Sequence, residues 1–119
     1  MPTYVRLFAD ADGHARFEDC ELQLSPESPR LDQLGVSEPL PASAAFFVRA
    51  PAGGSHPEQP ESRRQLVVGL SGECTVTASG ETRVVRPGDV LLVEDTDGFG
   101  HSSQTTEGFT ALMIPLGDQ

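Results

Sequence analysis

The chain has 119 residues, enough for one domain with its own hydrophobic core. Its net charge of −10 argues against nucleic acid and against an anionic membrane surface, because both require clustered Lys and Arg, so we expect neither partner. All 8 basic residues are arginine, which excludes a Schiff-base lysine mechanism.

The first residues predict a β-hairpin. Residues 4–9 have the pattern of a strand, Asp10 to Gly13 supply turn residues, and residues 14–24 return as a second strand. Neither face of that second strand is cleanly apolar, which favours a position at the edge of a sheet. The acidic turn lacks the full ligand set of a calcium loop, so we interpret it as a turn alone.

The next segment, residues 25–42, contains four of the ten prolines and predicts an irregular arm with one short helical turn near Leu31 to Leu34. Because it is long for a structureless loop, we expect it to pack over a sheet or a partner subunit. Residues 1–43 would then form N-terminal strands and an arm packed on a barrel of residues 44–119, in one structural domain. This arm and the exposed edge strands predict a homodimer.

The rest of the chain predicts short strands and no helix of useful length. Gly72, Gly80 and the Pro87-Gly88 pair provide turn signals, and a flexible Pro- and Gly-rich segment contains His56. Such evenly spaced strands are typical of an antiparallel sandwich or barrel. The expected strands are 44–50, 63–70, 73–79, 82–86, 90–93 and 109–116. The expected core is Phe46, Phe47, Leu66, Val68, Leu70, Val76, Val84, Val90, Leu92, Phe109, Leu112 and Ile114.

The two cysteines, Cys20 and Cys74, are far apart in the sequence and do not form a disulfide framework. We interpret them as reduced thiols. No signal peptide or membrane-spanning apolar run is visible in the sequence. We therefore expect a cytoplasmic protein.

The stretch LSGECTVTASGETRVVRPGDVLLVED, residues 70–95, resembles the cupin family. Gly72 matches the glycine that ends the first cupin motif, and Pro87-Gly88-Asp89 followed by an apolar strand matches the start of the second. The resemblance extends from residue 44 to about residue 116. It implies an all-β fold, an antiparallel jelly-roll β-barrel of the small bacterial RmlC-like kind, here with an N-terminal hairpin and arm. Such proteins are often dimers.

The first cupin motif carries two histidines, separated by one residue, and a glutamate before its closing glycine. Counting back from Gly72, the glutamate position falls on Gln65, and the histidine positions fall within residues 58–61, which contain no histidine. His56 lies just before them, so an insertion in this loop would place it at the first histidine position.

The second cupin motif carries a third histidine, whose position falls on Phe99 by strict count. A loop longer by two residues would place His101 there instead. The resemblance therefore implies a metal set of His56, Gln65 and His101, with Glu58 or Glu61 as further ligands. The cofactor would be a divalent ion such as Zn, Fe, Mn or Ni, although an amide is a weaker ligand than the family's glutamate.

These residues support three hypotheses for function. In the first, a low-molecular-weight organic ligand binds inside the barrel, and His101 with Gln65 catalyses proton transfer of a lyase, isomerase or cyclase type. In the second, the metal set makes the protein a dioxygenase-like metalloenzyme. In the third, it is a non-enzymatic binding or sensor module. The predicted ligand-binding residues are His56, Arg63, Met113 and Phe47, with Arg63 suited to a carboxylate or phosphate group.

Overall fold

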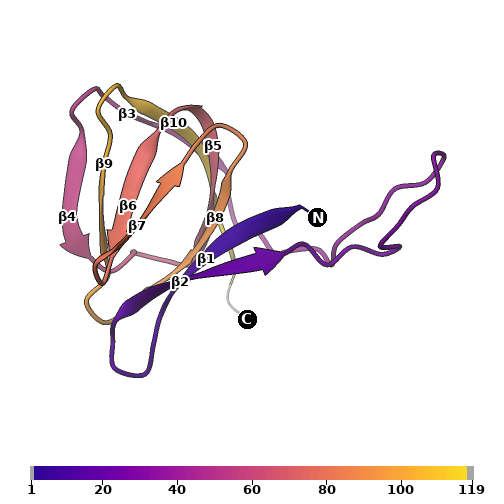
Figure 1. Ribbon diagram of the computed structural model, residues 1–119, viewed down its shortest axis with the longest axis horizontal. Helices are drawn as coiled ribbons and strands as arrows, with labels where there is room; N and C mark the ends of the chain where they lie inside the picture. Colours follow the sequence, from indigo (N-terminus) through magenta and orange to yellow (C-terminus); the bar gives the residue numbers. More distant parts are fainter. Residues whose placement is uncertain (1, 118–119) are drawn as a thin grey trace.

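The computed structural model describes residues 2–117 and contains ten β-strands in two sheets (Figure 1). The described residues include no helix, and hence none long and apolar enough to cross a membrane. The two sheets face each other without closing into a continuous barrel, an arrangement consistent with a jelly roll. The predicted all-β jelly-roll class is therefore confirmed.

The larger sheet has six strands in the order β2-β1-β8-β5-β10-β3. The N-terminal hairpin belongs to this sheet, because β1 pairs with β8. That pair is parallel, and all other neighbouring strands of the sheet are antiparallel. The second strand of the hairpin lies at the sheet edge, as the sequence predicted. The bounds are β1 Thr3–Ala9, β2 Ala15–Glu21, β3 Phe46–Ala50, β5 Gln65–Gly72, β8 Val90–Glu94 and β10 Phe109–Pro115.

The smaller sheet has four strands in the order β4-β9-β6-β7. Its edge strand β4 covers residues for which the sequence predicted a flexible segment. That segment becomes a strand because β9 offers its free backbone edge and pairs with it antiparallel. The bounds are β4 Ser55–Gln59, β6 Cys74–Ala78, β7 Glu81–Val85 and β9 His101–Gln104.

The core lies between the two sheets. Its buried members include Leu7, Val76, Val93, Phe109 and Ala111. On β5, and on β10 beyond the correctly predicted Phe109, the side chains that face inward are the neighbours of those predicted, because consecutive residues of a strand point to opposite faces. The prediction that Phe46, Phe47 and Leu70 are core residues is wrong, since their exposed fractions are 39%, 73% and 44%. Leu66, Val68, Leu112 and Ile114 are only partly buried, on the outer face of the six-stranded sheet.

A long connection between β2 and β3, residues 22–45, extends well away from the two sheets (Figure 1). We call it the arm. An antiparallel bridge between Ser25 and Val36 pairs the arm with itself, and a second bridge joins Ala42 to Leu116. Near its far end the backbone N–H of Gln33 donates to the carbonyl of Arg30 in a single turn. The predicted helical turn at this place is therefore a simple turn.

A carboxylate shared by two arginines joins β1, β8 and the segment before β5. The Nε of Arg6 donates to Glu94 at 2.6 Å, and the Nε of Arg64 donates to the other oxygen of the same carboxylate. Burial favours the neutral carboxyl of Glu94, but the hydrogen bonds from Arg6 and Arg64 outweigh it and hold its pKa below the ordinary value. The carboxylate of Glu94 is thus ionised and hydrogen-bonded to both arginines. It is therefore unsuited to act as a base.

We expect Glu94→Gln to lower the free energy of unfolding at neutral pH by roughly 1–2 kcal/mol, because two charge-assisted hydrogen bonds weaken and Arg6 is partly screened by solvent. A lowered pKa stabilises the folded state above the unfolded value of about 4.5 and loses that stabilisation as pH falls through the folded value. The difference between the two proteins should therefore shrink below about pH 4.5. Urea unfolding at a series of pH values measures it, and a difference that grows toward acid pH would contradict the assignment.

Candidate metal centre

Three side chains from different elements converge at one end of the space between the sheets. They are His56 on β4, Glu61 in the connection from β4 to β5, and His101 on β9. One ligand atom from each lies within 4.8 Å of the others. The two imidazole rings are stacked, with their centroids 5.6 Å apart. Two imidazoles and a carboxylate form a donor set that can hold a divalent metal ion.

The pairing of β4 with β9 brings the two histidines together. Ser103 lies opposite His56, and His101 lies opposite Gln59, with a shift in register between the two pairs. The shift gives β4 one extra residue, as in a β-bulge, and bulges commonly redirect side chains beside functional sites. The histidines therefore share one place although they are 45 positions apart in the sequence.

The ring of His101 is held by a buried carboxylate. Asp95 is completely buried, and its Oδ2 lies 2.5 Å from Nδ1 of His101. Since Nδ1 is engaged there, Nε2 of His101 is the atom directed toward Glu61, whose Oε1 lies 3.9 Å away. A carboxylate behind a histidine fixes both the ring orientation and the tautomer, an arrangement common behind metal-binding histidines.

The ring of His56 is oriented by the backbone. Its Nδ1 lies 3.0 Å from the carbonyl oxygen of Pro57 and can donate to it, which leaves Nε2 as the ligand atom. His56 is partly exposed, whereas the side chain of Glu61 is 14% exposed and that of His101 is 7% exposed. The cluster is therefore open to solvent on the side of His56 and Glu61, and closed on the side of His101.

Burial disfavours the charged form of His101, but the hydrogen bond that its Nδ1 donates to Asp95 and the charges of Asp95 and Glu61 outweigh it and raise its pKa above the ordinary value. The surroundings of Nε2 therefore favour positive charge. A proton and a metal ion compete for the same lone pair on this atom.

Gln65, predicted as a metal ligand, begins β5 and is buried beside Glu61. Its Nε2 donates to Oε2 of Glu61, and the backbone N–H of Glu61 donates to the carbonyl of Asp95 at 3.0 Å. The structure thus brings Gln65 to the cluster as the partner of the carboxylate. Within residues 2–117, the buried Oε1 of Gln65 and Oδ1 of Asp95 have no hydrogen-bond partner.

The remaining predicted residues lie elsewhere. Met113 is partly buried against the core, and Phe47 is exposed on the outer face of β3. Arg63 is exposed and lines an open groove with Arg64 and Glu94, and Glu58 is exposed on β4. His14, predicted to be a surface residue, is exposed, and its ring stacks on Phe99.

Asp95 was not predicted from the sequence, and strand alternation is the signal that identifies it. Leu91 and Val93 are buried in the core, so Asp95, two residues further, continues the inward-facing series while Glu94 points outward. An acidic residue placed inward just after a buried strand requires a partner, and a histidine within reach is a suitable one.

Gly100 allows β9 to begin against the end of β4. Its φ is +78°, and a Cβ at this position would lie 2.0 Å from the carbonyl carbon of Gln59. Any side chain here would collide with backbone, which cannot yield as a flexible side chain does. The close contact places His101 directly opposite Gln59 and so fixes the distance between the two histidine-bearing strands.

Fold and cluster together define a jelly-roll protein with a candidate His–Glu–His metal centre. The model of the Cupin domain family matches residues 46–115, more than half of the chain. The protein belongs to the cupin family, as the sequence motifs indicated. Comparison with curated proteins gave no match.

Solved structures of cupins resemble this chain. An RmlC-like cupin from Shewanella frigidimarina has a TM-score of 0.53 at 16% identity, over 97% of this chain and 86% of that one. A Cupin 2 conserved barrel domain protein from Salinispora arenicola has a TM-score of 0.50 at 18% identity, over 62% of this chain and 61% of that one.

DMSP lyase DddQ from Ruegeria pomeroyi has a TM-score of 0.53 at 29% identity, over 71% of this chain. The matched part is 41% of the lyase chain, so this protein spans less than half of that enzyme.

We expect Gly100→Ala to destabilise the protein by more than about 2 kcal/mol, because the methyl group collides with backbone in addition to the strain of positive φ. Gly80→Ala is the matched control, since Gly80 has φ of +83° but open space around the added atom, and it should cost only about 1 kcal/mol. Thermal unfolding of both variants measures the difference. Equal losses would mean that β4 does not press against β9 as described.

Proposed function

We propose that this cupin holds a divalent metal ion through His56, Glu61 and His101, and that it binds a low-molecular-weight organic ligand there and transforms it by proton transfer. The observation that carries the proposal is the convergence of the three ligand atoms within 4.8 Å. Two imidazoles and one carboxylate occur in zinc enzymes and in non-haem iron enzymes, in each case with positions left open for water or substrate.

Electrostatics support a cation at this site. Asp95 is fully buried and Glu61 nearly so, and both face the single imidazole of His101. Two carboxylates at low solvent exposure are costly unless positive charge offsets them. A divalent ion would supply that charge, while Gln65 would hold the carboxylate of Glu61 in place as a supporting residue. Zn, Fe, Mn and Ni all accept these donors, and the choice among them stays a prediction.

The chemistry that we propose is proton transfer of a lyase, isomerase or cyclase type. When bound, the ion would polarise a carbonyl or carboxylate of the ligand. Among the chain's own residues, Glu61 would serve as a ligand of that ion, because Gln65 holds one of its oxygen atoms and the other faces the cluster. The 29% identity to a protein described as a DMSP lyase supports a lyase reaction, over the matched part alone.

The ligand would approach from the side of His56, next to a polar, uncharged groove of about 320 Å³ on the outer face of the four-stranded sheet. Hydroxyl and amide groups in such a groove can hydrogen-bond a small polar molecule. The other lining residues are Ser55, Pro57, Thr75, Thr77, Ser102, Ser103 and Gln104. We further infer a cytoplasmic location, which the free thiols of Cys20 and Cys74 support.

A second candidate function uses His101 without a metal ion. The buried Asp95 at Nδ1 and the open Nε2 of His101 form a pair of the kind that orients a general base. The same Nε2 lone pair cannot bind a metal ion and accept a proton from the ligand, so the metal content of the active protein separates the two candidates. A protein that binds a ligand without forming product would instead be a sensor module.

The first test is metal content. Protein purified without chelator should contain close to one divalent ion per chain by plasma mass spectrometry. Glu61→Gln preserves the shape of the side chain but removes its charge, so it should weaken binding by at least about tenfold. His14→Ala is the control, because His14 is exposed and stacks on Phe99 outside the cluster. The proposal fails if no added Zn, Fe, Mn or Ni binds, or if Glu61→Gln binds as well as the control.

The second test concerns Asp95. Asp95→Asn retains the volume of the side chain but removes the charge behind His101, and we expect metal affinity to fall by about 10–100-fold while the fold persists. Competition with a coloured chelator measures the affinity, and far-ultraviolet circular dichroism measures the fold. Asp97→Asn is the matched control, since Asp97 is exposed in the following loop. The same affinity for both variants would remove Asp95 from the site.

A further inference from the structure

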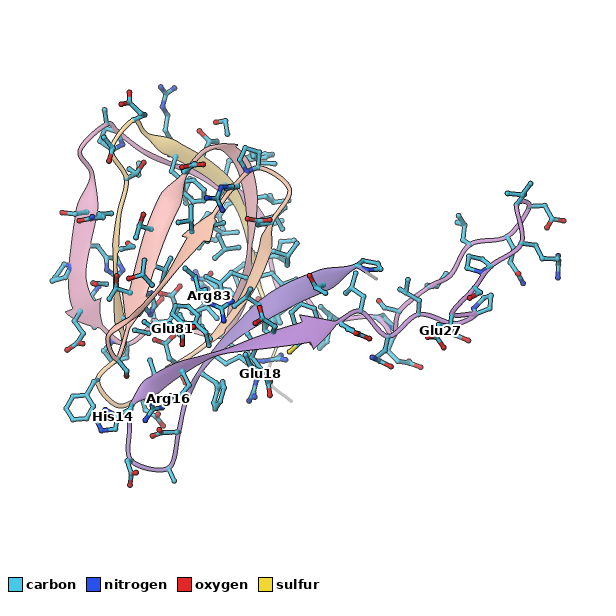
Figure 2. All side chains as sticks on the ribbon, in the orientation of Figure 1. His14, Arg16, Glu18, Glu27, Glu81 and Arg83 are labelled. Atoms are coloured by element: carbon cyan, nitrogen blue, oxygen red, sulfur yellow. The ribbon has the colours of Figure 1, made fainter. Side chains whose placement is uncertain are left out.

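Most arginines of this acidic chain are neutralised by carboxylates. Within residues 2–117, six of the eight arginines form ion pairs. Figure 2 shows one of these pairs on β7, where Arg83 and Glu81 lie side by side. The two arginines without an ion pair in this part of the chain are Arg49 and Arg63, and both are exposed. A guanidinium without a carboxylate partner is free to bind an anion from solution.

Arg63 lies in an open groove of about 470 Å³. The walls of this groove come from the segment before β5, the end of β8 and the residues just after β10. Arg63 and Arg64 bring two guanidinium groups to it, and Ser62 and Thr96 bring two hydroxyl groups. Guanidinium N–H groups and hydroxyls are all hydrogen-bond donors for an oxyanion. The groove therefore gathers donors of the kind that an anionic ligand requires.

The carboxylate of Glu94 also lines this groove, but it does not cancel the positive charge there. One of its oxygens accepts a hydrogen bond from Arg6 and the other accepts one from Arg64. Three arginines, Arg6, Arg63 and Arg64, against this one carboxylate leave a net charge of +2. The whole chain has a net charge of −10. A local positive charge in a groove of an acidic protein attracts small anions to that place.

The guanidinium of Arg64 is already held in position. Its Nε donates to Glu94, and its Nη1 is buried without a hydrogen-bond partner among residues 2–117. Because the five N–H donors of a guanidinium lie in one rigid plane, fixing Nε also fixes the direction of the others. The side chain of Arg64 is 29% exposed and lines the groove. A ligand that binds there thus meets an oriented group, and little side-chain entropy is lost on binding.

We propose that this groove is an anion-binding site and that its ligand is a small organic molecule with a phosphate group. Arg63 and Arg64 bind the phosphate oxygens, and the hydroxyls of Ser62 and Thr96 donate further hydrogen bonds. A phosphate dianion matches the net charge of +2, and its three terminal oxygens accept more donors than the two oxygens of a carboxylate do. The volume of about 470 Å³ falls in the range of small-molecule sites, so the groove has room for the organic part of the ligand.

The phosphate site uses other side chains than the metal cluster. Residues 62–64 stand between Glu61 and Gln65, which are hydrogen-bonded to each other beside the cluster. In the same way, Asp95 stands between two groove residues but is hydrogen-bonded to His101. None of the cluster residues lines the groove. The same two segments of backbone thus serve the cluster with some side chains and the groove with others, and phosphate binding requires no metal ion.

The test begins with glycerol phosphate as the probe and acetate as the competing anion. Both are titrated into the full chain at constant ionic strength and above about pH 7, where a phosphate monoester is close to a dianion. Glycerol phosphate should bind at least about tenfold more tightly than acetate. The backbone amide signals of Ser62 and Thr96 should shift in nuclear magnetic resonance spectra, because these residues line the groove.

Two variants test the donors separately. Arg63→Gln should weaken binding of glycerol phosphate by at least about tenfold. Arg49→Gln is the matched control, because Arg49 is also exposed and without an ion pair within residues 2–117 but lies on β3, outside the groove. Thr96→Val keeps the shape of the side chain and the charge of the groove but removes a hydroxyl, and it should weaken binding by roughly threefold or more. Circular dichroism should be unchanged in all three variants, since the three side chains are exposed.

A chelator separates this site from the metal cluster. Glycerol phosphate should bind equally well before and after metal is removed from the wild-type protein, whereas binding that disappears with the metal would place the phosphate at the cluster and overturn the proposal. The proposal also fails if acetate binds as tightly as glycerol phosphate, if Arg63→Gln binds as well as Arg49→Gln, or if Thr96→Val has no effect, since charge alone would then account for the binding. The metal cluster uses other residues, so each of these failures leaves the proposed function standing.

Discussion

The hydrogen bond between Asp95 and His101 is the interaction on which the candidate centre depends. A completely buried carboxylate must have a partner, and Nδ1 of His101 provides it at 2.5 Å. The backbone carbonyl of the same aspartate accepts the N–H of Glu61. One residue therefore sets both the ring orientation of His101 and the position of the loop that carries the carboxylate, and the cluster forms around these two constraints.

Glu94 and Asp95 show how strand alternation gives two adjacent carboxylates different roles. Glu94 points outward and ties β1 and the segment before β5 together through Arg6 and Arg64. Asp95 points inward and orients His101. The ion pairs of Glu94 hold the end of β8, and Asp95 follows directly after that end. The structural role of Glu94 and the chemical role of Asp95 are therefore coupled, although the two side chains lie on opposite faces of the sheet.

Much of the fold could be predicted from the sequence, because its signals are local. Gly72, Gly80 and the Pro87-Gly88 pair mark real turns, and the cupin motifs around them identified the family. The face of β5 and β10 that enters the core could not be predicted, since both faces are apolar and a one-residue choice reverses the assignment. The place of Glu61 in the cluster could not be read from the motif count, because that count runs along β5 from Gly72 to Gln65, whereas Glu61 lies in the connection before β5 and reaches the histidines only in the fold.

The cluster is buried on one side and accessible to solvent on the other, because its two histidines lie on strands with different numbers of paired neighbours. His101 lies on β9, which is paired on both sides, whereas His56 lies on β4, an edge strand paired with β9 alone in its sheet. Exposure follows the same division, because His56 has intermediate exposure and His101 is buried. His101, on the strand that is paired on both sides, thus carries the charge and the fixed tautomer. The edge strand β4 is the side that can move when a ligand enters. A histidine on each of two paired strands gives the site both properties.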